Sequence, residues 1–308
     1  MQMLRLLLKR TVHSFFLIAA VVSVVFLTTF VIGDPVRALL PAETPEEIVE
    51  KYREERGFNR PVLVQYVDYM RHAFVGDFGD SWWQRTPALP IALRPLPATF
   101  QLGIIAMILA TSLGIPIGVY AGMNPGSWAD RLATVTSLLG VSMPLIWLCP
   151  MLAFIFAVTL GLLPTAGYGS WQHMVLPTIA LAALPLGRIV QITRASIIDE
   201  LVKQYVTTAR AKGLPYRRVL VQHVLRNALL PVITVSGWEF VLVVSGYTII
   251  VEAVFGWPGV GWMLFSAIRI RDVPLLAATA FVIAVVVVLI NFAIDILYII
   301  VNPLIKYE

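Results

Sequence analysis

Charged side chains inside long apolar runs are the first candidates for function in this sequence. Glu239 lies in such a run. A carboxylate surrounded by hydrocarbon costs about 2.5–3.5 kcal/mol unless it is paired or faces water. Two interpretations follow from that cost. Either Glu239 lines a pathway and meets a cationic group such as an ammonium, or it accepts a structural hydrogen bond from a neighbouring helix.

A second polar group lies in the last apolar run. Asn291 and Asp295 are four residues apart, so they share one face of a helix. Arg188 and Arg194 lie in an earlier apolar segment, at a similar distance from its end. We therefore predict a structural pairing of Asp295 with Arg188 or Arg194.

The stretch from Glu252 to Gly259 combines an acid, aromatic residues and helix breakers. It contains Phe255, Trp257 and Pro258. Dense glycine and proline are typical of a broken or re-entrant segment, which a membrane protein tolerates where the backbone is buried or lines a cavity. The segment is then either a gate or docking surface, or part of an interfacial aromatic belt with Trp262.

Other kinds of chemistry find no support in the residue spacing. The four histidines are scattered without paired ligand spacing, and the lone Cys149 lies in an apolar run. The sequence contains no G-x-x-x-x-G-K-[ST] phosphate loop and no spaced Ser/His/Asp set. We therefore predict no catalytic residue, no metal site and no bound nucleotide in this chain. The histidines are His13, His72, His173 and His223.

Composition places all these residues in a membrane protein. Hydrophobic residues make up 58% of the 308 residues and charged residues only 13%, against about half and about a quarter in a soluble domain. The net charge of +5 is explained by Lys and Arg that flank apolar spans. The expected fold is therefore an all-α integral membrane protein.

Six apolar stretches approach the roughly 20 residues that a span requires. The first follows Arg5, Lys9 and Arg10 and is predicted to be a retained signal anchor. The fourth is the weakest, because Pro177, Pro185 and Arg188 interrupt it. The predicted spans are residues 11–33, 98–121, 133–160, 174–193, 228–251 and 274–301.

Basic residues near the spans predict the orientation. They cluster at the N-terminus and between spans four and five, two segments that an even number of spans puts on one side. The positive-inside rule makes that side the cytoplasm. Residues 34–97 then form an external loop, and we expect helices in it that begin at Thr44-Pro45-Glu46-Glu47, ending near Gly57, and at Pro61. The tail 302–308 is cytoplasmic.

Residues 198–227 have the pattern of a helix–glycine–helix hairpin. Residues 199–212 contain neither proline nor glycine, Gly213 breaks the run, and Pro215 is suited to start a second helix. Such a hairpin can insert into a cleft on a cytoplasmic partner and carry its motion into the spans. The alternative is a solvated basic loop that touches anionic lipid headgroups.

Two motifs carry a resemblance to a known family. Residues 205–214, Tyr-Val-Thr-Thr-Ala-Arg-Ala-Lys-Gly-Leu, followed by Arg226-Asn227-Ala228-Leu229-Leu230-Pro231, resemble the "EAA" loop of ABC-importer permeases. The stretch 252–261 and the Gly33-Asp34-Pro35 and Gly76-Asp77-Phe78-Gly79 segments agree with the dipeptide/oligopeptide/nickel branch, and the long external loop resembles its B-type subunit. This sequence departs in having Thr207-Thr208-Ala209 for the Glu-Ala-Ala triplet and Asn302-Pro303-Leu304 for the usual Asp-Pro-Arg.

The resemblance implies a type I ABC-importer permease of six helices, with a five-helix core over 98–301. It implies a peptide importer in which a second homologous permease completes the pathway, an external binding protein delivers the solute, and two cytoplasmic ATPases bind ATP and Mg. Nickel or another small solute is the alternative cargo, and an ion-gradient transporter is a more distant alternative. The coupling residues it implies are Tyr205, Thr208, Ala209, Arg210, Ala211, Lys212, Gly213 and Leu214.

Overall fold

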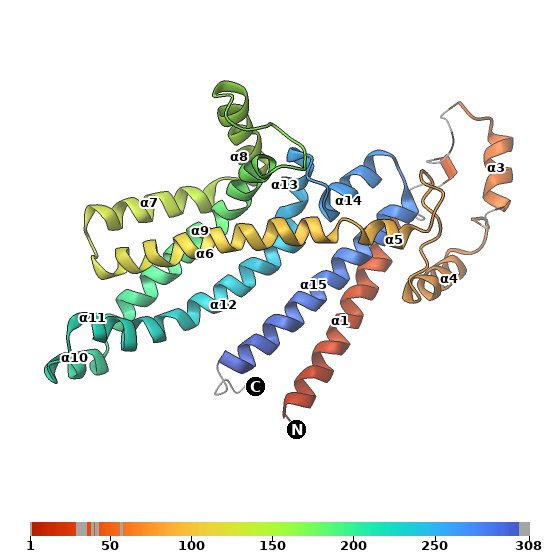
Figure 1. Ribbon diagram of the computed structural model, residues 1–308. Helices are drawn as coiled ribbons and strands as arrows, with labels where there is room; N and C mark the ends of the chain where they lie inside the picture. Colours follow the sequence, from red (N-terminus) through yellow and green to blue (C-terminus); the bar gives the residue numbers. More distant parts are fainter. Residues whose placement is uncertain (1, 29–35, 38–39, 41–42, 56–57, 302–308) are drawn as a thin grey trace. The chain divides into compact units, whose positions relative to one another are not determined.

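In the part of the chain that it describes, the computed structural model contains helices, the loops that join them and an isolated β-bridge between Asp80 and Pro87 (Figure 1). It describes all residues except 1, 29–35, 38–39, 41–42, 56–57 and 302–308. The predictions made for Gly33-Asp34-Pro35, Gly57 and Asn302-Pro303-Leu304 lie outside the described residues.

The α-helices follow one another along the chain in the order α1 (Gln2–Phe26), α3 (Glu46–Glu55), α4 (Val62–Phe74), α5 (Ala88–Leu93), α6 (Leu96–Met123), α7 (Trp128–Ser142), α8 (Leu145–Leu152), α9 (Trp171–Leu201), α10 (Gln204–Ala211), α11 (Tyr216–Val219), α12 (Arg226–Leu242), α13 (Thr248–Phe255), α14 (Val260–Arg269) and α15 (Val273–Val301). Besides the π-helical residues 27–28 after α1, the π-helical segments η2 (Ala153–Thr159), η3 (Leu220–Leu225) and η4 (Val243–Tyr247) interrupt them.

Among the described residues, four helical stretches are long and apolar enough to cross a membrane. A fifth span is possible if α7 and the following Leu145–Thr159 count as one, although they are bent by 105°. The bend falls at Pro144, which has no N–H to donate and disfavours helical backbone at Met143. The predicted first span is described as an apolar helix only over Thr11–Phe26, which is shorter than a span. The four stretches are Ala88–Met123, Trp171–Leu201, Tyr216–Phe255 and Val273–Ile294.

The fourth predicted span is stronger than its sequence suggested. Helix α9 runs unbroken through Pro177 and Pro185, both of which are buried. More than half of its most apolar window is covered by the protein itself, the largest share among the four candidate spans. Neighbouring helices therefore protect the backbone carbonyls that the prolines leave without a donor. The interruption that we expected to weaken this span is accommodated by packing.

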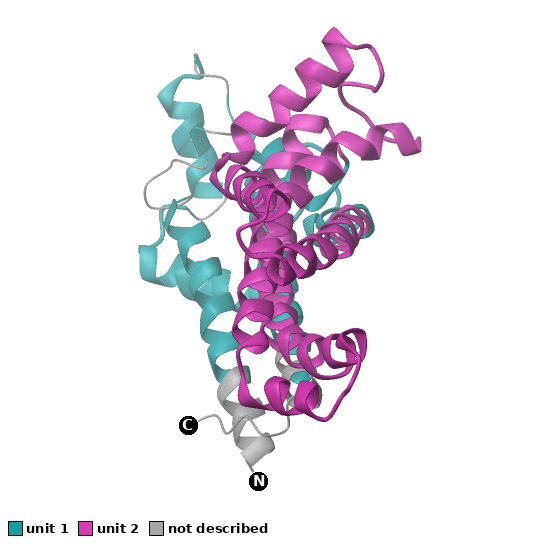
Figure 2. Cartoon of the chain, turned by 90° about the vertical axis from the view of Figure 1, so that its left-hand side faces the viewer, with its two compact units in different colours: residues 1–98, 258–296 teal, residues 99–257, 297–308 magenta. Residues whose placement is uncertain are grey.

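The chain divides into two compact units, coloured separately in Figure 2. One comprises residues 1–98 and 258–296, and the other residues 99–257 and 297–308. In the first unit, the hydroxyl groups of Ser23 on α1 and Tyr66 on α4 lie 2.7 Å apart and share a hydrogen bond. Asp272 also accepts hydrogen bonds from Ser81 and from the backbone N–H of Leu275 at the start of α15. The Tyr66 ring also packs against Phe26 of α1, with ring centres 5.3 Å apart.

Helix α9 is the centre of the second unit, where it packs against α7 and α12. Glycines spaced four residues apart on α6 allow a further close approach. A Cβ added at Gly114, Gly118 or Gly122 would lie 2.6–2.8 Å from the side chain of Ile189, Thr193 or Ile197, respectively. This small-xxx-small spacing lets two helices approach at backbone distance. It fixes α9, which carries Arg188, Arg194 and the root of the hairpin.

Helix starts in the segment before α6 agree with the sequence. Helices α3 and α4 begin directly after Pro45 and Pro61, as their proline signals predicted. Gly76 and Gly79 adopt positive φ of 80° and 78°, a backbone conformation that favours glycine. The short α5 had no clear signal in the sequence, because its six residues are too few to show a helical period.

Candidate functional site

The predicted hairpin is present between α9 and α12. Helix α10 ends at Ala211, Gly213 has a φ of +76°, and α11 begins after Pro215 (Figure 1). Nothing lies within 4 Å of where a Cβ would be on Gly213, so its positive φ rather than lack of space accounts for the glycine. The second helix does not stop near Asn227, as we had expected, because Tyr216–Phe255 forms one continuous helical stretch.

Helix α10 has one buried and one exposed face. Val206 and Ala209 are buried with Ile197 of α9 and Val224 and Ala228 of the following stretch. Their neighbours on the other face are solvent-exposed: Thr207, Thr208, Arg210, Ala211 and Lys212.

The predicted coupling residues are divided between the buried and the exposed face of α10. Ala209 belongs to the hairpin's own core, with 8% exposure, and Tyr205 and Leu214 are half-buried. A partner can therefore contact Thr208, Arg210, Ala211 and Lys212 directly, whereas Ala209 holds the hairpin together.

A polar network at the root of the hairpin joins three helical segments. Glu200, at the end of α9, accepts hydrogen bonds from Lys203 Nζ at 2.5 Å and from the Tyr205 hydroxyl. The Asn227 amide of α12 donates to the same tyrosine oxygen at 3.2 Å. Glu200 is only 8% exposed, and both its carboxylate oxygens are bonded. The network therefore fixes α10 to α9 and to α12.

The titration behaviour of this network follows from its contacts. The hydrogen bond to Glu200 raises the pKa of Lys203. Burial, followed by the hydrogen bond to Glu200, raises the pKa of Tyr205. Both shifts favour the protonated state that donates to the carboxylate.

A cation–π contact connects the two short helices of the hairpin. The Arg210 guanidinium lies 5.3 Å from the centre of the Tyr216 ring. Such contacts contribute about 0.5–1 kcal/mol at exposed sites. This contact and the hydrogen bond from the Leu214 N–H to the Ala209 carbonyl, at 3.3 Å, together hold the turn closed.

Two arginines of α9 are paired with carboxylates of other helices in the same unit. Arg188 Nη1 lies 2.5 Å from Oε1 of Glu239 on α12. Arg194 donates twice to Asp130 of α7, at 3.0 Å for Nη2 to Oδ2. Asp295, their predicted partner, has no described side chain. The structure thus gives Glu239 the interhelical hydrogen bond of our second interpretation.

Asp130 is a residue that sequence reasoning missed. It is 3% exposed, and its carboxylate also accepts from the Gly126 N–H at 2.9 Å, while Ser127 Oγ accepts from the Asp130 N–H. This pattern is a variant of the capping box in which the acid is Asp and accepts from the residue before the cap Ser127. The Ser127-x-x-Asp130 spacing was therefore the available signal. Glu200 carried a weaker one, its three-residue spacing from Lys203.

The segment expected to form a gate is largely buried. Glu252, Phe255 and Trp257 have exposures of 0%, 1% and 2%. Thr99 donates to Glu252 Oε1 at 2.7 Å, and the Trp257 ring packs edge-on against Tyr168 at 4.7 Å.

Gly256 ends α13 with a φ of +60°, and the chain continues through the half-buried Pro258 and the buried Gly259. The Trp257 side chain is therefore covered by its own unit, whereas Trp262 is 37% exposed.

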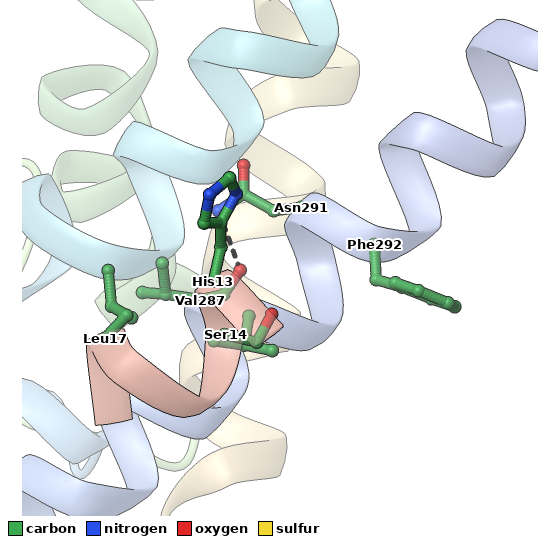
Figure 3. Close-up of a pocket in the computed structure, with 7 residues that line it drawn as sticks. His13, Ser14, Leu17, Val287, Asn291 and Phe292 are labelled. Atoms are coloured by element: carbon green, nitrogen blue, oxygen red, sulfur yellow. Dashed lines mark hydrogen bonds between the residues drawn. The ribbon is translucent and has the colours of Figure 1, made fainter. Parts of the chain in front are cut away.

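The remaining predicted polar residue, Asn291, binds its own helix. Its amide donates to the Val287 carbonyl at 2.9 Å. It also borders a hollow of about 180 Å³ between α1 and α15, in which His13 and Asn291 lie close together and Phe292 points away (Figure 3). Among the described residues no three His, Cys, Asp or Glu side chains gather as metal ligands.

Comparison with known proteins relates both parts of the chain to one transport system. Residues 114–307 match the family described as "Binding-protein-dependent transport system inner membrane component", and residues 3–102 match its N-terminal counterpart. The glutathione transport system permease protein GsiC of Salmonella typhimurium strain LT2 is 38% identical over 308 residues, 99% of this chain and 100% of the relative. The protein of the same name from Escherichia coli strain K12 is 37% identical over the same shares.

Solved structures share the fold at lower identity. An inward-facing form of the MetNI methionine ABC transporter superposes with a TM-score of 0.58 and 18% identity, over 68% of this chain and 95% of that one. An amino acid ABC transporter with histidines gives 0.55 and 16%, over 68% and 93%. The chain therefore belongs to the inner-membrane permease family of binding-protein-dependent ABC importers, in its peptide and nickel branch, and is a transport subunit rather than an enzyme.

Proposed function

We propose that this chain is the B-type permease of an ATP-driven peptide importer and that the hairpin after α9 receives the force of a cytoplasmic ATPase. The single observation that carries the proposal is the division of α10 into two faces. One face is packed and hydrogen-bonded to α9 and α12, and the other presents Arg210, Ala211 and Lys212 to solvent. A load on the exposed face is therefore passed directly to two candidate membrane spans.

The rest of the proposed machine follows from family membership. A second homologous permease forms the other half of the pathway, two cytoplasmic ATPases bind Mg-ATP, and an external binding protein delivers the solute. Six spans put both termini and the hairpin on the cytoplasmic side, with the bent α7–η2 pair and the α1 region as two of the six. In this scheme 1–33 is the first helix, 34–97 the external loop, 98–301 the core and 302–308 the tail.

Small peptides are the proposed cargo. Relatives that span this whole chain are named as glutathione permeases, and glutathione is peptide-like. Nickel or another small solute remains the alternative within the branch. Transport assays with dipeptides, oligopeptides, glutathione and nickel in the purified complex would separate these cargoes.

The coupling proposal is tested by adding bulk to the exposed face of α10. Ala211→Trp is expected to abolish co-purification of the ATPases, because the new ring occupies the contact surface. Val202→Trp is the matched control, since Val202 is 78% exposed at the base of the hairpin and outside that face. Ala209 is unsuitable for this test, because bulk there would disrupt the hairpin's own core. Normal ATPase binding and ATP-dependent uptake with Ala211→Trp would overturn the proposal.

A further inference from the structure

Arg188 lies roughly midway along α9, at about 20 Å from its C-terminal end for a rise of 1.5 Å per residue. It is paired with Glu239, but the two side chains differ in accessibility. The arginine side chain is 38% exposed and the glutamate side chain 1%. The cation is therefore the accessible member of the pair, with the carboxylate buried behind it.

A guanidinium in this position cannot face lipid at low cost. Charged side chains at the centre of a span cost at least about 2.5–3.5 kcal/mol, and they almost always face the interior of a bundle or a water-filled cavity. Pairing with Glu239 does not remove that requirement, because more than a third of the arginine side chain stays uncovered. The surface of α9 around Arg188 must therefore meet water or another protein surface.

We propose that this surface lines the aqueous pathway and that Arg188 binds an anionic oxygen of the passing solute, as a carboxylate presents. The inference rests on the proposed transport function and deepens it by naming the charge of the recognised group. A guanidinium has five N–H donors in a fork that matches a carboxylate, and the bond to Glu239 is made by Nη1 alone. The Tyr247 side chain of η4 also interacts with the guanidinium, and the donors that remain are available for a second anion.

The charge of this proposed site is opposite to the charge that the sequence suggested for the pathway. A pathway-lining Glu239 would have met an ammonium group, but its residue exposure is 0%. Its second oxygen, Oε2, is buried and has no hydrogen-bond partner among the described residues. The carboxylate thus serves to hold the arginine in place, and the arginine is the group that a solute can reach.

Thiol labelling beside Arg188 tests the site without knowledge of the solute. In the assembled complex with Cys149→Ala, Leu184→Cys and Ile192→Cys place a thiol one turn before and one turn after Arg188, on the same helical face, and both positions are half-buried. Two membrane-impermeant methanethiosulfonates, one bearing a sulfonate and one a trimethylammonium, are applied with and without ATP. Both thiols are expected to react, and the sulfonate reagent is expected to be favoured.

The charge of Arg188 should set that preference. Replacing the pair by Arg188→Gln with Glu239→Gln should lower the sulfonate-to-ammonium rate ratio about fivefold, and Arg188→Lys should preserve it. The double variant avoids an unpaired buried carboxylate, so it tests charge without sacrificing the fold. A ratio that does not change would overturn the anion site. Absence of labelling at both positions would show a dry contact with the partner permease and would also overturn it.

These results are independent of the coupling proposal. If the unmodified complex lacked ATPases, the proposed function would be refuted, but the sulfonate-to-ammonium labelling ratio could still be measured. Normal ATPase binding with an unchanged ratio would refute only the anion site.

Discussion

Two buried glutamates in the second compact unit are bonded in different ways. At the root of the hairpin, Glu200 has a partner on each oxygen, Lys203 on one and Tyr205 on the other. Near the middle of the helical stretch Tyr216–Phe255, Glu239 has Arg188 on one oxygen and no hydrogen-bond partner for the other among the described residues. A fully bonded network holds one geometry, whereas a partly bonded pair keeps donors for a ligand. The first arrangement suits a mechanical joint and the second suits a binding site.

Breaking the mid-helix pair gives the largest expected effect. Arg188→Leu leaves Glu239 buried without its cation and should destabilise the protein by about 3–5 kcal/mol. Glu239→Leu combined with Arg188→Met should restore most of that stability, because no charge is left buried. Thermal or chemical unfolding of the purified protein measures both variants. Equal destabilisation by the single and the double variant would contradict the pairing.

The close approach of α6 to α9 should give the next largest effect. A Cβ at Gly118 would lie 2.6 Å from Thr193 Cβ and 2.8 Å from the Val190 carbonyl, so Gly118→Ala should cost about 1–3 kcal/mol. Gly246→Ala is the matched control, because nothing lies within 4 Å of its Cβ position. The two melting curves should differ clearly, and coincident curves would show that α9 is not held by this contact.

Loosening the joint at the hairpin should have a smaller effect on stability and a specific effect on coupling. Tyr205→Phe removes the hydroxyl that links Glu200 to Asn227, at a cost of about 1–3 kcal/mol. ATPases should still bind, because the exposed face of α10 is unchanged, but more ATP should be hydrolysed for each solute transported. Thr136→Val on α7, outside the hairpin and with a hydroxyl that bonds only carbonyls of its own helix, is the control. An unchanged ATP-to-solute ratio in Tyr205→Phe would contradict the joint.

The smallest expected effect is a pH dependence of the same joint. Lys203 and Tyr205 both have a raised pKa in the folded state. Their contribution to the stability of the hairpin is therefore complete below their unfolded-state pKa values, near 10, and is lost as the pH rises through their folded-state pKa values. Proteolysis within the hairpin should therefore accelerate above about pH 10. Lys203 is half-exposed, which keeps its share small. Tyr205→Phe should reduce this increase in the proteolysis rate with pH. An increase identical to that of the unchanged protein would show that Tyr205 does not cause it.

Local features of the fold could be predicted from sequence because they depend on local chemistry. Gly213 and the prolines before α4 and α11 mark turns and helix starts by fixing φ or removing a donor, whatever the rest of the chain does. The break at Pro144 uses the same chemistry, but an apolar run on both sides concealed it.

Pairings between distant residues could not be predicted in the same way. Arg188 had several carboxylates within plausible reach along the sequence, and the packing of α9 against α12 pairs it with Glu239. Burial of Trp257 likewise depends on Tyr168, a residue 89 positions earlier. Composition places Arg188 and Trp257 in the membrane region, but it does not show which face of each helix is covered by a neighbouring helix.

The most direct test of the account is the accessibility of the exposed face of the hairpin. With Cys149→Ala as background, Ala211→Cys is exposed to a membrane-impermeant maleimide. The account predicts no labelling in intact cells, labelling in inside-out vesicles stripped of ATPase subunits, and protection when those subunits are returned. Labelling from outside intact cells, or equal labelling with and without the ATPases, would contradict it.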